Sequence, residues 1–60
     1  MKLLLSSNSL EGITDSLNKY FYSTTYRILN GSVTWKNGEV KNDLILKVTK
    51  GRFKIYSTNN

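Results

Sequence analysis

The order of hydrophobic and polar residues between positions 24 and 57 predicts antiparallel strands joined by tight turns. Asn30-Gly31 and Asn37-Gly38 are strong signals for a two-residue hairpin turn, because a type I′ turn needs a positive φ at both central residues. Lys50-Gly51 is a weaker signal of the same kind, since Lys tolerates a positive φ less well than Asn. Directly opposed residues share a face of the sheet, so each turn predicts which side chains lie together.

The three turns agree in sorting hydrophobic side chains to one inner face. The first turn sets Ile28 opposite Val33. The second turn sets Trp35 opposite Val40, so Trp35 is the expected core anchor. The expected inner face consists of Tyr26, Ile28, Val33, Trp35, Val40, Leu44, Leu46, Val48, Phe53 and Ile55.

The middle of this pattern contains an interruption. The third turn sets Leu46 opposite Ile55, with the same parity as the first two turns. A single strand over residues 39–49 would nevertheless be longer than its preceding partner. We therefore expect a bulge or a short break at Asn42-Asp43.

One amphipathic helix is expected before the hairpins. Leu10, Ile13 and Leu17 follow the spacing of a single helical stripe. Asn8 is the expected N-cap, and Glu11 three residues later completes a pair typical of a capping box. The hydrophobic face of the sheet is the surface within the chain on which this stripe can be buried.

These elements define an α+β fold class. One N-terminal helix packs on a mostly antiparallel four-stranded meander, and Lys2–Leu5 adds a short N-terminal strand whose pairing the sequence leaves open. We expect a single small domain over residues 1–60. A chain of this size buries only about 60% of its unfolded surface, and without Cys it has no disulfides to compensate. A homodimer is therefore a possible remedy.

Charge and alternation together predict a binding surface. The chain has nine Lys and Arg residues against four Asp and Glu residues, a net charge of +5. Six basic residues fall on the outer face of the expected sheet, interleaved with hydroxyl side chains and with two acids, Glu39 and Asp43. Such a face suits phosphate contacts, so we expect binding to DNA or RNA. The candidate residues are Arg27, Lys36, Lys41, Lys47, Arg52 and Lys54, together with Tyr56.

Other interpretations of the same face stay open. Leu29 and Ile45 project outward among the cations and could mark a contact with a protein, so the chain could be a small inhibitor or adaptor that binds an acidic partner. The face could also be merely solvated, with Lys protecting strand edges. Exposed tyrosines could stack on unpaired bases, but parity turns Tyr22 and Tyr26 inward, which favours core packing.

The residue types give little support for catalysis. The chain has no His and no Cys, so the usual general base and thiol nucleophile are missing, and we expect no enzyme activity, metal or cofactor. No hydrophobic run exceeds the three residues of Leu3-Leu4-Leu5, which is too short to span a membrane or serve as a signal peptide. We expect a cytoplasmic protein, and its many Lys and Asn residues are consistent with a virus or mobile element as source.

Overall fold

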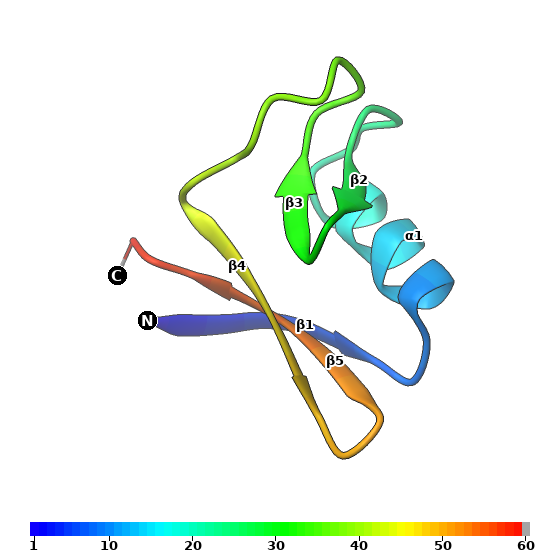
Figure 1. The fold of residues 1–60 in the computed structure, drawn as a ribbon, viewed down its shortest axis with the longest axis vertical. Helices are drawn as coiled ribbons and strands as arrows, with labels where there is room; N and C mark the ends of the chain where they lie inside the picture. The colour runs from blue at the N-terminus through cyan, green and yellow to red at the C-terminus, as the bar shows by residue number, and fades with distance from the viewer. Residues whose placement is uncertain (60) are drawn as a thin grey trace.

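The computed structural model describes residues 1–59 and contains one helix and five strands in antiparallel sheets (Figure 1). The elements in chain order are β1 (Lys2–Ser7), α1 (Leu10–Tyr20), β2 (Arg27–Leu29), β3 (Ser32–Thr34), β4 (Leu44–Thr49) and β5 (Arg52–Ser57). The α+β class is confirmed, but the arrangement differs from one four-stranded meander. The strands form a three-stranded sheet in the order β1-β5-β4 and a separate β2-β3 hairpin.

The N-terminal strand β1 is a full member of the larger sheet and pairs with the C-terminal strand β5. Leu3 lies opposite Tyr56 and Leu5 lies opposite Ile55, with a bulge between the two pairs. Leu4 is the additional residue of this bulge, and both Leu4 and Leu5 pack against the core. Pairing on both sides makes β5 the central strand of the sheet.

Two of the three predicted turns have the expected geometry. The φ angles are 52° and 78° at Asn30-Gly31, and 51° and 76° at Lys50-Gly51, so both central residues are in the left-handed region that a type I′ turn requires. The predicted registers are confirmed, with Ile28 opposite Val33 and Leu46 opposite Ile55.

The second turn differs from its prediction by one residue. Only Gly38 has a positive φ there, and its amide donates to the Trp35 carbonyl at 2.9 Å. The Trp35 amide in turn donates to the Glu39 carbonyl at 2.9 Å. This is a three-residue loop, a type I turn followed by a left-handed glycine. Thr34 therefore lies opposite Val40, and the predicted pairing of Trp35 with Val40 is wrong.

The shift of one residue exchanges the side chains that face the core. Trp35 lies outside the buried cluster and is not the core anchor, and Val40 is 49% exposed. Thr34, expected on the outer face, is only 2% exposed and donates to the Arg27 carbonyl at 3.4 Å. The interruption expected at Asn42-Asp43 is a break, because the chain turns there before β4 begins.

The helix begins one residue later than the predicted cap implies. Ser9 is the N-cap, and its hydroxyl accepts from the Gly12 amide at 3.0 Å, so the assignment of Asn8 is wrong. Ile13 and Leu17 are fully buried, as the stripe predicts, but Leu10 is exposed.

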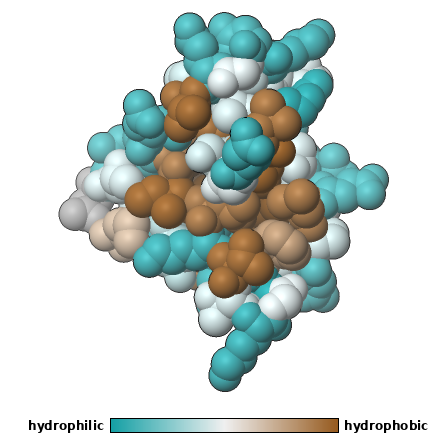
Figure 2. Space-filling model, in the orientation of Figure 1, coloured by the Kyte–Doolittle hydropathy of each residue, from teal (hydrophilic) through white to brown (hydrophobic). Residues whose placement is uncertain are grey.

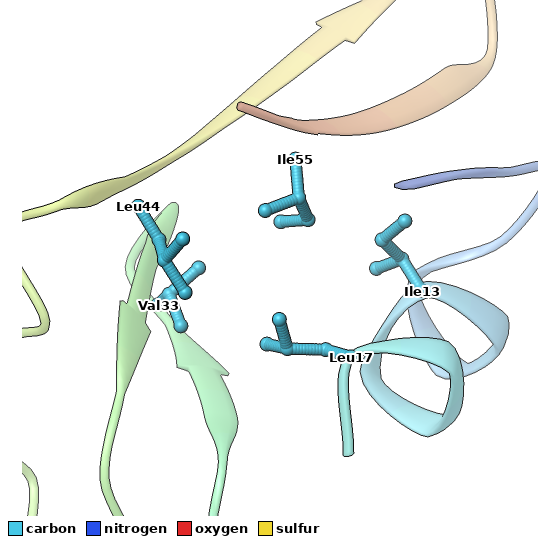
Figure 3. Packing of buried hydrophobic residues seen from close by; sticks show 5 residues of the cluster. All are labelled: Ile13, Leu17, Val33, Leu44 and Ile55. Atoms are coloured by element: carbon cyan, nitrogen blue, oxygen red, sulfur yellow. The ribbon is translucent and has the colours of Figure 1, made fainter. Parts of the chain in front are cut away.

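The core lies between the β1-β5-β4 sheet on one side and α1 with the β2-β3 hairpin on the other (Figure 3). Ile55 projects from the sheet toward Leu17, and Ile13 approaches it from the first half of the helix. The buried side chains are Ile13, Leu17, Val33, Leu44 and Ile55. So small a core leaves the stability sensitive to single methyl groups.

The change Ile55→Val tests this core. It removes one buried methylene and should lower the free energy of unfolding by about 0.5–1.5 kcal/mol in a urea titration. Val48→Thr is the matched control, because Val48 is 58% exposed and Thr also suits a strand. Equal losses in both variants would contradict the central position of Ile55.

The change Lys50→Asn tests the third turn. Lys50 has a φ of 51°, and Asn adopts the left-handed region more readily than Lys. The variant should raise the free energy of unfolding by about 0.5–1 kcal/mol. A decrease in the urea midpoint would show that the tip does not hold this conformation.

Candidate nucleic-acid interface

One face of the β1-β5-β4 sheet is covered by α1 and the β2-β3 hairpin, and no other helix or strand within residues 1–59 covers the opposite face (Figures 1 and 3). We call this opposite face the outer face. Its side chains alternate with those that face the core, as the registers of the three strands require. They are Leu3, Ser6, Ile45, Lys47, Thr49, Arg52, Lys54 and Tyr56.

The outer face concentrates positive charge at the β4-β5 hairpin. Lys54 on β5 lies directly opposite Lys47 on β4, with Ser6 of β1 on its other side. Arg52 precedes Lys54 by two residues on β5, so its side chain lies on the same face of the sheet. None of the three strands contains Asp or Glu. Like charges directly opposite one another are destabilising, so this pair of lysines does not favour folding.

Arg52 connects the hairpin to the beginning of the chain. Its guanidinium donates to the Ser6 hydroxyl at 2.9 Å and to the Asn8 side-chain carbonyl. These contacts hold the positive charge of Arg52 on the outer face, beside the end of β1. They also account for Asn8, which binds Arg52 instead of capping the helix.

Tyr56 lies in a hydrophobic row across the same face. Its neighbours on the adjacent strands are Leu3 and Ile45. The Lys47 ammonium lies 5.5 Å from the centre of the Tyr56 ring, a cation–π contact. The ring is therefore already in contact with a cation of the protein.

The two acidic residues that the sequence placed among these cations lie elsewhere. Glu39 belongs to the loop after Trp35, and Asp43 precedes β4. The Asp43 carboxylate lies 3.1 Å from the ammonium of Lys41. The outer face is consequently more uniformly positive than the sequence predicts.

Lys41 itself serves the fold. Its ammonium lies 5.3–6.0 Å from the ring centres of Phe21, Tyr26 and Trp35, and its side chain is only 16% exposed. Three aromatic rings and one carboxylate thus surround this cation. Lys41 joins the end of the helix to the loop between the two sheets.

The remaining predicted residues lie outside the outer face. Arg27 is on β2 of the smaller hairpin, where its guanidinium donates to the Thr24 and Tyr26 carbonyls at 2.9 and 2.8 Å. Lys36 is exposed in the three-residue loop. The structure therefore brings together Lys47, Arg52, Lys54 and Tyr56, and separates from them Arg27, Lys36 and Lys41. Leu29 and Ile45 also lie on different sheets.

Lys50 was not among the candidate binding residues predicted from the sequence. Its position predicts only a turn, but it adds a fourth cation to a hairpin in which residues 44–57 include no acid. Every residue from Lys47 to Arg52 is exposed, and the hairpin extends away from α1 (Figure 1). In the same orientation, hydrophilic side chains extend from the free end of this hairpin (Figure 2). The long stretch without acids was a signal visible in the sequence.

Other kinds of site find no support in the described part of the chain. Residues 1–59 contain no group of three or more His, Cys, Asp or Glu side chains arranged to hold a metal ion. Over the same residues, α1 is the single helix, and it is neither long nor apolar enough to cross a membrane.

Comparison with known proteins adds no identification. No protein-family model, no curated protein and no solved structure matches the chain. A function must therefore be inferred from the geometry of the molecule itself.

The change Lys41→Met tests the structural role of this lysine. Met keeps a hydrophobic stem but loses the charge, so the free energy of unfolding should fall by about 1 kcal/mol and the emission of Trp35, the single tryptophan, should change. Lys36→Met is the control, and it should alter stability by less than about 0.5 kcal/mol. Equal effects in both variants would exclude the aromatic enclosure as a source of stability.

Proposed function

We propose that this protein is a non-enzymatic nucleic-acid-binding protein that contacts phosphates through the outer face and the tip of the β4-β5 hairpin, with Lys47, Arg52 and Lys54 supplying the cations of the face and Lys50 that of the tip. The observation that carries the proposal is the direct opposition of Lys47 and Lys54 on strands without any carboxylate. A phosphate between the two ammonium groups would convert their repulsion into attraction.

Protection of strand edges does not account for both lysines. Lys at an edge strand prevents pairing with another chain, and this explanation suits Lys47 on the edge strand β4. Lys54 is on β5, which is paired on both sides and has no edge to protect. The charge of Lys54 therefore favours an anionic ligand.

The shape of the surface favours a duplex. The β4-β5 hairpin is a two-stranded ribbon with an exposed, basic tip, and the major groove of B-DNA, about 12 Å wide, accepts such a ribbon. Tyr56 is the single aromatic residue of the outer face and already contacts Lys47. The face thus suits phosphate contacts better than stacking on unpaired bases.

A protein partner is the second candidate function. Leu29, Val40 and Val48 are each about half exposed, and hydrophobic side chains gather across the middle of the surface in Figure 2. An acidic partner could add a strand at the edge of β4. The expected homodimer and the cytoplasmic location also stay predictions.

The single change Lys47→Glu separates binding from folding. It sets a carboxylate opposite Lys54, so stability should rise by about 0.2–1 kcal/mol while affinity for a DNA duplex falls. In an anisotropy titration at several salt concentrations, the slope of log K against log[salt] should flatten by about 0.9 for each phosphate that the variant no longer neutralises.

Lys2→Glu is the matched control. Lys2 is exposed and lies opposite Ser57, on the other face of the same sheet, so the variant has the same net charge but keeps the outer face intact. The proposal is wrong if both variants change the slope equally, or if neither does.

A further inference from the structure

A residue with a strained backbone follows the C-cap of α1. Tyr22 has a φ of 51°, in the left-handed region that is normally filled by Gly after a helix. The Ser23 amide donates to the Asn18 carbonyl at 2.8 Å, and the Tyr22 amide to the Lys19 carbonyl at 3.3 Å. These two bonds define a Schellman motif with a tyrosine at its glycine position.

The side chain of Tyr22 does not compensate for this strain by packing against the core. It is 99% exposed, so the inward orientation expected from strand parity is wrong. Its aromatic neighbours Phe21 and Tyr26 pack against the core, and Tyr22 does not. A bulky residue that is both strained and fully exposed indicates a role outside folding.

Tyr22 borders a hollow between α1 and the segment that leads to β2. Two cations and several hydroxyl groups line it, and within residues 1–59 no Leu, Ile, Val or Met side chain does. Among the described residues, Asp15 is the one side-chain carboxylate of the lining, so the lining carries a net positive charge. The lining residues that matter here are Lys19, Arg27, Thr14, Thr24 and Thr25.

Arg27 is held at the rim of this hollow with donors to spare. One terminal nitrogen, Nη1, makes both of its bonds to backbone carbonyls. Within residues 1–59 the structure gives no hydrogen-bond partner to Nε or Nη2. A guanidinium has five N–H donors, so Arg27 can still bind a phosphate.

We propose that Tyr22 and this hollow bind single-stranded nucleic acid, with the Tyr22 ring stacked on an unpaired base and with Lys19 and Arg27 on the flanking phosphates. The inference rests on the proposed function and adds a second site to it. An exposed ring beside cations and hydroxyl groups is the combination that binds single strands. The net positive charge of the lining is complementary to the phosphates of a nucleic-acid strand.

The β4-β5 hairpin would bind double-stranded nucleic acid, and Tyr22 with its hollow would bind single strands. The outer face has one aromatic ring, which already contacts Lys47, whereas the Tyr22 ring is fully exposed. Preference for unpaired bases should therefore depend on Tyr22, and duplex affinity on the β4-β5 hairpin.

The test compares Tyr22→Gly with Tyr22→Phe, using a fluorescent oligothymidine and a mixed-sequence duplex of equal length. Tyr22→Gly removes the ring and should weaken binding to the single strand by about fivefold to a hundredfold, while duplex affinity changes by less than about twofold. Tyr22→Phe keeps a stacking ring and should retain the single-strand affinity. Tyr22→Gly should also melt at a higher temperature, because glycine fits the left-handed position.

The outcomes separate this inference from the proposed function. Unchanged single-strand affinity in Tyr22→Gly overturns the inference, while a wild-type protein that still binds the duplex retains the proposed function. An equal loss for both ligands also overturns it, since stacking requires an unpaired base. A wild-type protein that binds neither ligand overturns both and leaves the protein partner as the alternative. A lower melting temperature for Tyr22→Gly would also overturn the inference, because it would show that the ring is present to stabilise the fold.

Discussion

The burial of Ile55 at the centre of β5 is the constraint from which both faces of the molecule follow. Leu5 and Leu46 flank it on the neighbouring strands, and the helix covers it. Because side chains alternate along a strand, a buried Ile55 directs Lys54 and Tyr56 to the opposite face. A slip of one residue would bury a lysine and expose the core, so the hydrophobic effect that folds the sheet also sets the register of the candidate interface.

The parts of the fold that could be predicted from the sequence are those that depend on local turn chemistry. Asn30-Gly31 and Lys50-Gly51 each fix a two-residue turn, and each turn alone determines the facing pairs beside it. The second turn could not be predicted this way, because an Asn-Gly pair is compatible with both a two-residue and a three-residue loop. Only Gly38 adopts the left-handed region there, and this single choice excluded Trp35 from the core.

The candidate site, like the fold, was predictable only where a single local turn determines it. Parity within the β4-β5 hairpin correctly placed Lys47 and Lys54 on the same face, since one turn controls both. Contacts between distant segments could not be predicted, because no local pattern encodes them. The enclosure of Lys41 by rings from the end of the helix and from the loop after β3 is such a contact. The pairing of β1 with β5 is another, at the two ends of the chain.

The two hairpins differ in whether their residues favour the folded conformation, and the unfavourable residues of the β4-β5 hairpin indicate a function. The tip of the β2-β3 hairpin has Asn, which adopts the left-handed region at little cost, whereas the β4-β5 hairpin has Lys50 at the equivalent position. The same hairpin sets Lys47 opposite Lys54. Tyr22, after the end of α1, is a further residue whose left-handed backbone conformation disfavours folding. A chain of 60 residues has little stability in reserve, so residues that oppose folding need another reason to be present. All of these residues except Lys54 are exposed, and Lys54 projects on the uncovered face, so each can meet a ligand without any change in the core. Positions where local preference and fold disagree are expected at functional sites, and here they coincide with cations and with an exposed aromatic ring.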